Sequence, residues 1–561
     1  MTVLVFAATW VFRWLTIDFT NDHFVHLSRA RQILLGEIPV RDFFDPGLPL
    51  HYYASAAALM AFGQNLLGEA ILTVTFVALG AALTFYLAVR TSRSVLLALI
   101  ATMVAVVLFP RLYNYPKIFL YPLALVAIAH YAARRNTTAI VVLGMITAVA
   151  ALFRLDHGLY VGIAVTVGLF LTDVDQLRNA ATAFLRYAVV VGVLLLPFVV
   201  FVQVTTGVPS FLAEIRQQRA AVAGARILSI PFSVDRALPM VVVDPPSTSN
   251  TSWLLRARNR WPLLRTRVAP GVLSAANALA WLYYVTVLMP VAALVMLVVQ
   301  WRRGRPGPAE RVTIGAAIVI CLVIHQALLR ESPDSRLPDV AGPTVVLAAW
   351  LTGSLLQTVQ RRARIILRVA VTVVWMATLW SATTFGEFGE RLTATGLPAG
   401  PSATAERFHQ VSIWMQMRPI DLYAPSGDST GIRALTRYVL ECTRPSDRIL
   451  AGSFEPQLFF YAERAFAGGQ VYLKGGWHDS EDAQKLTIER LQRQRVPIVI
   501  INAATEAEVQ SRFSLVYQYV QQNYREASRA NFGSGPDYAV FVKRDLPPRG
   551  QDTALGLPCY R

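Results

Sequence analysis

Cysteine and charge are both scarce in this chain. Only three cysteines occur among 561 residues, and no CxxC pair or Cys/His spacing suggests a metal site. Charged residues make up 16% of the sequence and hydrophobic residues 54%, whereas a soluble globular domain carries about 25% charged residues. We also find no internal repeat and no low-complexity tract. The composition therefore excludes an ordinary soluble globule and indicates a polytopic membrane protein.

Apolar runs that predict membrane helices recur along the first 385 residues. They lie at residues 1–17, 66–89, 95–110, 118–133, 139–153, 158–171, 187–206, 278–300, 312–329, 344–358 and 365–385. Several are shorter than the roughly 20 residues that cross a bilayer perpendicularly, so we expect about eleven spans. The first run carries Arg13 and lacks both a charged start and a small-residue cleavage site, which favours a retained helix over a cleaved signal peptide.

Lysine and arginine in short loops indicate the orientation, because such loops stay on the cytoplasmic side. The basic loops all fall on one side of the predicted membrane and contain Arg90, Arg93, Arg134, Arg135, Arg178, Arg186, Arg302, Arg303, Arg305, Arg361, Arg362 and Arg364. The first outer loop, residues 18–65, and everything after residue 386 are then outside a bacterial cytoplasmic (inner) membrane. These loops account for part of the net charge of +17, so membrane lipids are expected partners and nucleic acid is not.

A long outer loop at residues 207–277 breaks this charge pattern, because it holds nine arginines against three acidic residues. Long loops cross the membrane regardless of charge, so the predicted topology stands. Two interpretations stay open: a solvated surface that faces anionic lipid headgroups, and a site for an anionic substrate.

Past residue 386 charged residues become more frequent and the hydrophobic periodicity is mixed. Residues 386–428, with several Pro and Gly, predict a linker, and residues 429–561 predict a small α/β domain outside the membrane. Its expected elements are helices near 430–441, 480–494 and 504–525 and strands at 448–452, 496–502 and 538–543. Cys442 and Cys559 both fall in this oxidising exterior, so a disulfide between them is a candidate.

Four clusters of polar residues are predicted to face outward at the level of the membrane. They comprise Asp22, His23, Arg41, Asp42 and Asp45 in the first outer loop; Tyr113 and Lys117; Arg154, Asp156 and His157; and Arg330, Asp334 and Arg336. The apolar runs on both sides of Arg154 are too short to span untilted, which places its cluster below the membrane surface, where charges are usually functional or paired. The alternatives are a structural Arg154–Asp156 pair, an ordinary polar loop at 330–336, and interfacial anchoring at 111–117.

One carboxylate in the first outer loop together with arginines on later outer turns describes a general base and a site for a phosphate-bearing lipid. Arginine suits a phosphodiester because its guanidinium stays charged and binds two oxygens at once.

The first outer loop and the turn after it carry a loose motif. Its members are Asp22, Ala30, Leu34, Leu35, Gly36, Ile38, Pro39, Arg41, Asp42, Phe43, Phe44, Pro49, Leu50, Tyr52, Tyr53, Phe62 and Gly63. With the arrangement of apolar runs, the motif resembles the GT-C membrane glycosyltransferases related to protein O-mannosyltransferases and the lipid A aminoarabinose transferase. The resemblance implies a GT-C-type transmembrane catalytic domain over residues 1–385, and its motifs lie mainly within residues 20–90.

The resemblance implies an inverting transfer of a sugar from a polyprenyl-phosphate donor to an acceptor hydroxyl outside the cytoplasmic membrane, on a cell-envelope glycan, lipid or protein. Asp22 would be the general base that deprotonates the acceptor. The lipid phosphate would be the leaving group, and its developing charge would be stabilised by basic side chains. The candidates for this role are Arg154 and Arg330, followed by Arg41, Lys117 and Arg336. Asp156 and Asp334 would either hold these arginines in position or contact sugar hydroxyls, and the sequence does not separate the two roles. This scheme requires no cofactor.

The chain departs from the family pattern at His23, where a second acidic residue is frequent, and at Asp45-Pro46-Gly47, where a Pro-Pro pair is common. We therefore predict no metal site, although the sequence leaves open a divalent ion bound by Asp22 with Asp42 or Asp45. The histidines of this loop, His23, His26 and His51, are expected at the surface or in contact with substrate.

Three further interpretations stay open. Asp22 also suits a helix N-cap, because it precedes a helix-like run from His23 to Leu35. A transporter or flippase of lipid-linked sugars would also place charges in the membrane, but this chain has no inverted repeat and gathers its charges on one face. A non-catalytic assembly protein would tolerate loss of Asp22 but not loss of the domain after residue 386.

Overall fold

The structure of this protein, a computed structural model, describes residues 1–561 except 225–228, 231–240, 243–274, 331–332, 359–360, 423–429 and 534. Some side chains at the margins of these gaps, including those of Arg330 and Asp334, also lie outside the described residues. The chain forms two compact units. The first consists of Met1–Asp18, Thr73–Pro197 and Gly224–Phe408, and the second of Phe19–Leu72, Phe198–Ala223 and His409–Arg561.

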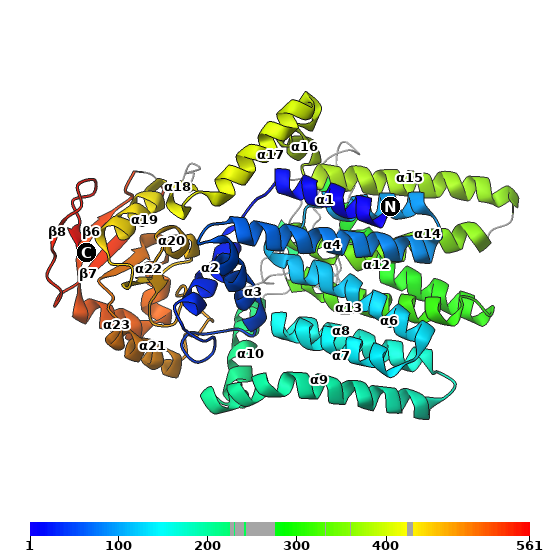
Figure 1. Cartoon of the computed structure of the whole chain (residues 1–561), viewed down its shortest axis with the longest axis horizontal. Helices are drawn as coiled ribbons and strands as arrows, with labels where there is room; N and C mark the ends of the chain where they lie inside the picture. Colours follow the sequence, from blue (N-terminus) through cyan, green and yellow to red (C-terminus); the bar gives the residue numbers. More distant parts are fainter. Residues whose placement is uncertain are drawn as a thin grey trace, which may run out of the picture. The chain divides into compact units, whose positions relative to one another are not determined.

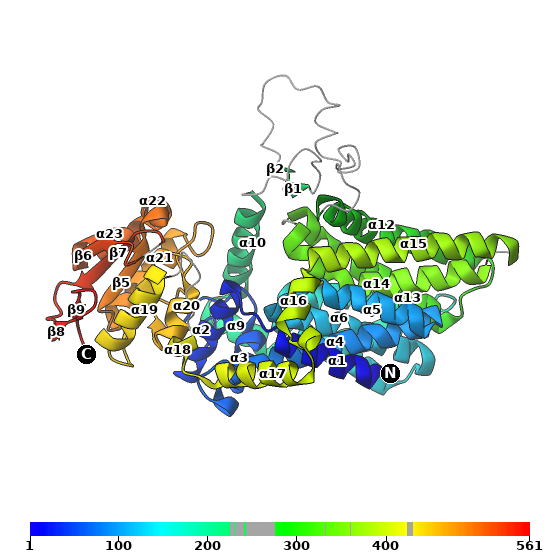
Figure 2. The ribbon, with the colours of Figure 1, turned by 90° about the horizontal axis from the view of Figure 1, so that it is seen from above.

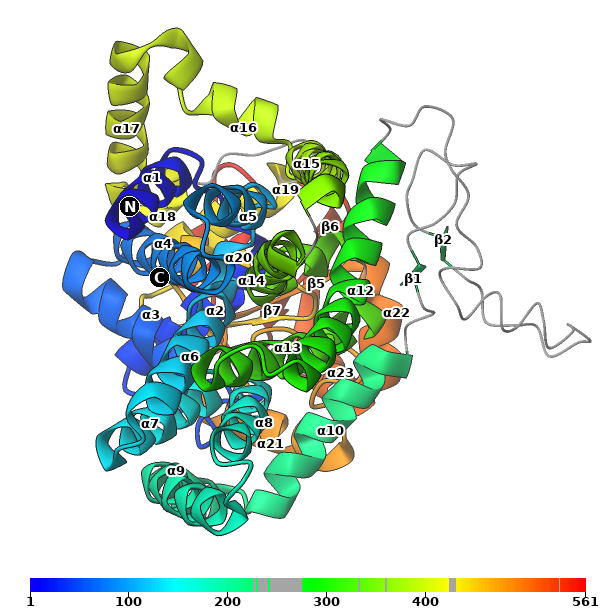
Figure 3. The ribbon, with the colours of Figure 1, turned by 90° about the vertical axis from the view of Figure 1, so that its right-hand side faces the viewer.

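The first unit is built from long apolar helices, which lie alongside one another in Figure 1 and are seen end on in Figure 3. They are α1 (Thr2–Leu15), α4 (Leu67–Ser92), α5 (Val95–Val107), α6 (Tyr115–Arg134), α7 (Thr137–Phe153), α8 (Leu155–Thr172), α9 (Leu177–Thr205), α12 (Ala275–Arg302), α13 (Pro308–Arg330), α14 (Pro333–Thr358) and α15 (Arg361–Phe385). Each predicted apolar run coincides with one of them. Within the described residues, eight are long and apolar enough to cross a membrane, and α1, α5 and α7 are shorter apolar helices.

Ion pairs tie the basic loops of this unit to one another. Arg93, after α4, pairs with Glu310 at the start of α13 at 3.1 Å, and Glu310 also accepts a hydrogen bond from the Trp350 indole on α14. Arg135, after α6, pairs with Asp173, after α8, at 2.9 Å. Loops that the sequence assigns to one side of the membrane are therefore in direct contact, as the predicted alternation requires.

Small residues let the helices of the first unit approach closely. A Cβ added at Gly80 on α4 would lie 2.4 Å from the carbonyl oxygen of Ile118 on α6, so only glycine fits this crossing. Close backbone approach at small residues is a common way of packing membrane helices. This crossing holds the first turn of α6, with Lys117, against α4.

Two local features position the polar residues of this unit. Arg154 adopts an extended backbone, with φ −172° and ψ 129°, and thereby ends α7 and starts α8. The helix α14 contains Pro338 and Pro343 and begins eleven residues before the predicted run at 344. Asp339 is therefore inside a membrane helix, one turn after Arg336.

The second unit contains a five-stranded mixed sheet in the order β4-β3-β5-β7-β6, of which Figure 2 labels β5, β6 and β7. The strands are β3 (Arg448–Ala451), β4 (Ala465–Phe466), β5 (Ile498–Asn502), β6 (Tyr524–Ala530) and β7 (Tyr538–Lys543). The strand β3 pairs in parallel with β4 and β5, and β7 pairs antiparallel with β5 and β6. Buried apolar residues of β5 and β7, such as Val499 and Phe541, pack with Leu491, Val509 and Val516 from the helices that follow β4 and β5.

The helices of this α/β region are α19 (Thr430–Cys442), α20 (Pro456–Tyr461), α21 (Glu481–Arg493), α22 (Ala503–Arg512) and α23 (Ser514–Asn523). The predicted α/β character is confirmed. The helix predicted at 504–525 is in fact two helices, because the backbone turns at the fully buried Phe513 and β6 begins at 524.

The first outer loop belongs to this second unit. It forms α2 (Asn21–Leu34) and α3 (Pro49–Phe62), and α2 packs against α20. The Ser28 hydroxyl donates to the carbonyl of Pro456 at 3.0 Å, and the Gln32 amide donates to the carbonyl of Phe466 at 2.8 Å. Residues more than 400 positions apart in sequence thus form one packed body, to which α10 (Val208–Gly224) also belongs.

The predicted linker at 386–428 is helical over most of its described length. It contains α16 (Phe388–Ala394), the short turn η3 (Leu397–Ala399), α17 (Pro401–Gln416) and α18 (Pro419–Leu422). Gly396 and Gly400, at φ +76° and +109°, separate these helices, and Pro401 starts α17, where its missing N–H costs nothing. The prolines and glycines mark helix boundaries here. Most of the predicted long outer loop, residues 207–277, lies outside the described residues. The described part includes α10 and two short paired strands, β1 (Ser229–Ile230) and β2 (Val241–Val242).

The predicted disulfide between Cys442 and Cys559 is present and joins the end of α19 to β9 (Pro558–Cys559), which pairs with β8 (Gly550–Gln551). It closes a segment of 117 residues. A cross-link over about 100 residues stabilises by about 4 to 5 kcal/mol through the unfolded chain. We expect Cys442→Ser with Cys559→Ser to lower the melting temperature of the purified protein clearly. As a control, Cys321→Ala should leave the response to reductant unchanged, because the buried Cys321 is a free thiol.

Candidate functional site

The first unit contains a polar cavity of about 40 Å³ among membrane helices. Polar side chains from α6, α8 and α14 dominate its lining, which consists of Lys117, Tyr121, Arg154, Asp156, His157, Tyr160, Ile324, Ala327, Arg336, Asp339 and Val340. Ionisable side chains inside a membrane helix bundle are costly and usually functional. This cavity is therefore the candidate site of the first unit.

Asp339 is the centre of one half of the cavity. Its carboxylate accepts hydrogen bonds from Lys117 Nζ at 2.6 Å and from Asn114 Nδ2 at 2.9 Å, and it pairs with Arg336 at 3.4 Å. Asp339 is 5% and Lys117 8% exposed, so the pair is taken out of water. Asn114 closes the short turn η1 (Leu112–Asn114) just before α6, which brings its amide to the same carboxylate.

Asp156 is the centre of the other half. It lies in the first turn of α8, where the helix dipole favours a carboxylate, and pairs with Arg154 Nε at 2.9 Å. His157 Nδ1 is 3.3 Å from the same carboxylate oxygen and 2.9 Å from the Tyr121 hydroxyl. The side chain of Arg154 is 40% exposed, while that of Asp156 is 4% exposed. The carboxylate is therefore held inside, and part of the guanidinium stays accessible.

The described lining residues of this cavity carry more positive than negative formal charge. Lys117, Arg154 and Arg336 carry three positive charges against the two negative charges of Asp156 and Asp339, with His157 neutral. Several cations in such a setting can bind an anionic group such as a phosphate.

The structure brings together five of the predicted site residues, namely Lys117, Arg154, Asp156, His157 and Arg336. Arg330 and Asp334, predicted alongside them, have side chains outside the described residues. The Tyr113 hydroxyl accepts a hydrogen bond from Arg111 at 3.2 Å and is not among the lining residues. Sequence reasoning missed Asp339 and Asn114. An acidic residue in an apolar helix was the available signal for Asp339.

Asp22 lies in the second unit, in the first turn of α2. The N-cap of this helix is Thr20, so the alternative that Asp22 itself caps the helix is wrong. Its charge acts on Tyr472 of the α/β region and raises the pKa of that phenol, whereas the charge of Arg29 lowers it. Burial raises the pKa of Tyr472 to about 12, which keeps this hydroxyl neutral at physiological pH.

The histidines near Asp22 are buried, so the predicted surface position is wrong and the alternative, contact with substrate, stays a prediction. His23 Nε2 is 2.8 Å from Glu69 Oε1, and both side chains are fully buried. The rings of His26 and His51 stack at 3.8 Å with an angle of 7° between their planes. Sequence reasoning missed Glu69, because it lies at the start of an apolar run and resembles an ordinary helix start.

Two further acidic residues of the first outer loop, Asp42 and Asp45, shape its turns. Asp42 accepts a hydrogen bond from the Ile38 backbone at 2.8 Å and pairs with the half-exposed Arg41 at 2.7 Å. Asp45 accepts from the backbone N–H groups of Gly47 and Leu48, both at 2.9 Å. Burial raises the pKa of Asp45 above its ordinary value, against these hydrogen bonds. Within the described residues, no three His, Cys, Asp or Glu side chains gather as a metal ion would need.

His478 connects three parts of the second unit. Its ring stacks on Phe44 of the first outer loop at 4.1 Å, and it contacts Glu214 and Gln218 of α10. Arg490 approaches the same Phe44 ring, at 4.9 Å from its centroid. Burial lowers the pKa of His478 below 6.5, although Glu214 acts in the opposite direction.

This lowered pKa predicts a loss of stability in acid. The unfolded chain takes up a proton near pH 6.5, whereas the folded chain does so only at lower pH, so the stabilisation is complete above pH 6.5 and declines as the pH falls. We expect the melting temperature of His478→Gln to depend less on pH between 7.5 and 5 than that of the wild type. His409→Gln, at an exposed histidine of the same unit, should follow the wild type. Equal pH profiles for all three proteins would contradict the prediction.

No family model matches this sequence. No curated protein matches it either. Among solved structures, the fold is similar to ArnT from Cupriavidus metallidurans in the apo state, with 14% identity, a TM-score of 0.47 and coverage of 96% of this chain and 97% of that chain. It is also similar to the archaeal oligosaccharyltransferase AglB from Archaeoglobus fulgidus, in complex with an inhibitory peptide and a dolichol-phosphate, with 11% identity, a TM-score of 0.43 and coverage of 97% and 75%.

At such identities and TM-scores the similarities determine neither the activity nor the substrates of this chain.

Proposed function

We propose that this protein is an integral-membrane inverting glycosyltransferase that moves a sugar from a polyprenyl-phosphate donor to an acceptor hydroxyl outside the cytoplasm. The single observation that carries the proposal is the polar cavity of the first unit. Among the described lining residues, three basic side chains gather there with two carboxylates inside a membrane bundle. A lipid-linked phosphate suits this site, because its phosphate is negatively charged and its lipid chain is soluble in the membrane.

In the proposed reaction, the acceptor oxygen attacks the anomeric carbon of the donor sugar. The new bond forms between that oxygen and the anomeric carbon, and the bond from the anomeric carbon to the phosphate oxygen breaks. Asp22 takes the proton of the acceptor hydroxyl, and the polyprenyl phosphate leaves with the electron pair. Arg154, Lys117 and Arg336 stabilise the charge that develops on the phosphate, with Asp156 and Asp339 holding them in place.

The remaining charged candidates have supporting roles in this scheme. Arg330 and Asp334 are proposed at the same phosphate site from the sequence alone. Arg41, Asp42 and Asp45 shape the loop that carries Asp22, and His23 supports the substrate site through its contact with Glu69. The protein is proposed to reside in a bacterial inner membrane, with its second unit and the acceptor outside the cytoplasm.

The test is transfer of radiolabelled sugar from a panel of polyprenyl-phosphate donors to cell-envelope extracts by the purified protein in detergent. Labelled product that depends on the protein and on one donor class would support the proposal. Absence of transfer from every donor, with movement of a labelled lipid-linked sugar across liposomes, would replace it by the flippase alternative. The charged cavity in the membrane bundle is the observation that keeps this second candidate in view.

The phosphate site makes a separate prediction. We expect Arg154→Ala to weaken donor binding at least about tenfold, because a charge-assisted contact to phosphate is lost. Its effect on the melting temperature should be small, since the Arg154 side chain is 40% exposed. Donor affinity is measured by competition with radiolabelled donor. The matched control is Arg135→Ala, which removes a 52% exposed arginine at the opposite helix ends and should leave donor affinity unchanged.

A further inference from the structure

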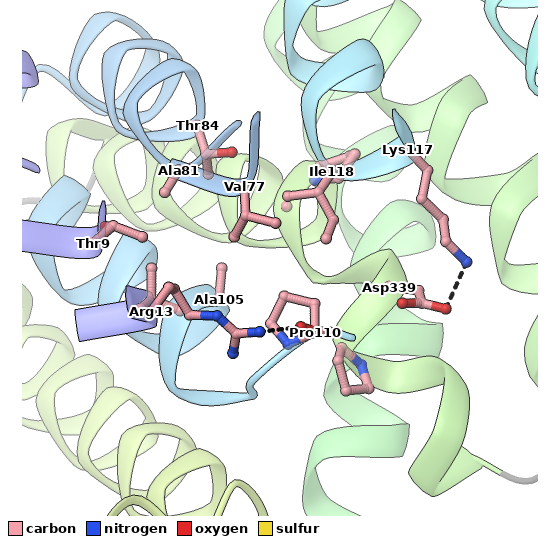
Figure 4. Close-up of a pocket in the computed structure, with 14 residues that line it drawn as sticks. Thr9, Arg13, Val77, Ala81, Thr84, Ala105, Pro110, Lys117, Ile118 and Asp339 are labelled. Atoms are coloured by element: carbon pink, nitrogen blue, oxygen red, sulfur yellow. Dashed lines mark hydrogen bonds and ion pairs between the residues drawn. The ribbon is translucent and has the colours of Figure 1, made fainter. Parts of the chain in front are cut away.

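A second cavity of the first unit is lined by a buried arginine that the proposed reaction does not use. Arg13 lies in the last turn of α1 and is 1% exposed. The cavity, of about 30 Å³, is shown in Figure 4, where the Arg13 guanidinium points from α1 towards Pro110. Thr9, Thr84, Lys117 and Asp339 supply its other polar lining. Lys117 and Asp339 line the first cavity as well, so the two cavities are neighbours.

The guanidinium of Arg13 is only partly satisfied. Its Nη2 donates to the carbonyl of Pro110 at 2.9 Å. Within the part of the chain that the structure describes, Nε and Nη1 have no hydrogen-bond partner, and no carboxylate forms an ion pair with this side chain. A buried charge without a counter-charge is strongly unfavourable, so these two groups call for an anionic partner.

The surroundings of Arg13 include a second positive charge and little that would offset the cost of burying its guanidinium. Its guanidinium lies 3.5 Å from the centroid of the Phe109 ring, and that of Arg391 lies 3.6 Å from the same ring. The attraction of one aromatic ring is small against the cost of burying an unpaired cation. The exposed Asp18, three residues after α1, is the carboxylate whose charge acts on Arg13, and the charge of Arg391 opposes it.

We propose that Arg13 binds the phosphate group of a membrane lipid at a second anion site beside the first cavity. Arg13 and Lys117 against Asp339 leave one positive charge in this cavity, and the Arg13 N–H groups are placed to donate to phosphate oxygens. The lining is otherwise apolar, with Val77, Ala81 and Ala105, which suits a ligand that arrives from the bilayer. The site takes either a polyprenyl phosphate or the headgroup of an anionic phospholipid. It does not require that the first cavity be catalytic.

The test uses the full-length protein in detergent, with farnesyl phosphate, phosphatidylglycerol and inorganic phosphate as probes and farnesol as the neutral control. Native mass spectrometry counts bound lipids, and titration of the melting temperature gives the affinity. We expect the wild type to bind two phosphate-bearing lipids and not farnesol. Arg13→Gln should lose one of them, with at least about a tenfold loss of affinity, and Arg154→Ala should lose the other. Whichever of farnesyl phosphate and phosphatidylglycerol binds more strongly at the Arg13 site identifies the class of lipid that supplies the phosphate.

A matched pair of variants separates binding from packing. Arg391→Gln removes the second cation at Phe109 without touching the cavity lining and should leave phosphate affinity unchanged. Arg13→Gln removes an unpaired buried charge, so its melting temperature without ligand should stay the same or rise. A lower melting temperature with unchanged phosphate affinity would make Arg13 purely structural and overturn the proposal. If Arg13→Gln does not fold, Arg13→Lys should keep binding and Thr9→Arg should block it; failure of both expectations would overturn the proposal too.

Two other results would also overturn the site. They are equal loss of affinity in Arg391→Gln, which would indicate a general charge effect, and stabilisation by inorganic phosphate as strong as that by the lipids. Sugar transfer is not measured in this experiment, and Arg154→Ala reports on the first cavity alone. Failure of the Arg13 site is therefore distinguishable from failure of the proposed function.

Discussion

Asp22→Asn is expected to abolish sugar transfer while leaving folding and donor binding intact. The substitution keeps the size and shape of the side chain and removes the basicity that deprotonates the acceptor hydroxyl. General base catalysis contributes about 10²- to 10⁴-fold to the rate, so turnover should fall by at least about 100-fold. The measurement is transfer of radiolabelled sugar under saturating donor, with donor affinity and melting temperature measured on the same preparation.

Asp18→Asn is the matched control for this prediction. Asp18 is an exposed carboxylate four residues before Asp22, so its removal changes the charge of the same loop without touching the proposed base. This control should turn over at the wild-type rate. Wild-type turnover in Asp22→Asn would rule out the assignment, and if Glu69→Gln then lost transfer, the base would be sought at the buried His23–Glu69 pair.

The membrane bundle could be predicted from the sequence because its determinants are local. An apolar run specifies a membrane helix wherever it occurs, and basic loops such as those of Arg93 and Arg135 give its direction. The same locality explains the strands at 448 and 498, which are short apolar runs between helical patterns. The strand β6 was missed because it pairs only with β7 and its sequence, YREASRA, has no apolar alternation.

The set of segments that form the second unit could not be predicted, because these segments are far apart in the sequence. Ser28 and Pro456 are 428 positions apart, and no pattern in either segment indicates their hydrogen bond. This long-range packing buries the loop histidines. Because no local pattern indicates it, a surface position was among the predictions for them. The carboxylate of Asp339 was missed for a different reason. Pro338 and Pro343 on both sides of it suggest the end of a helix, whereas neighbouring membrane helices tolerate such prolines.

The second prediction with a large expected effect concerns Asp339. Asp339→Asn removes the carboxylate that Lys117 and Arg336 share, and leaves the buried ammonium of Lys117 without a counter-charge. Breaking one side of a buried ion pair costs about 3 to 5 kcal/mol. We therefore expect a large fall in the free energy of unfolding, measured as a lower melting temperature and faster proteolysis. Asp173→Asn is the control, because its partner Arg135 is 52% exposed and such a pair is worth about 1 kcal/mol or less.

A double variant separates the cost of the unpaired charge from the loss of shape. Lys117→Met with Asp339→Asn removes both charges at similar volume, so it should be more stable than Asp339→Asn alone. The same double variant loses a cation of the cavity, so its donor binding should be weaker than that of the wild type even where stability returns. Stability would then depend on the balance of charge between Lys117 and Asp339, and donor binding on the ammonium group of Lys117. Equal stability of the single and double variants would mean that Lys117 reaches water or another anion in the folded protein, so that Asp339 is not its essential counter-charge.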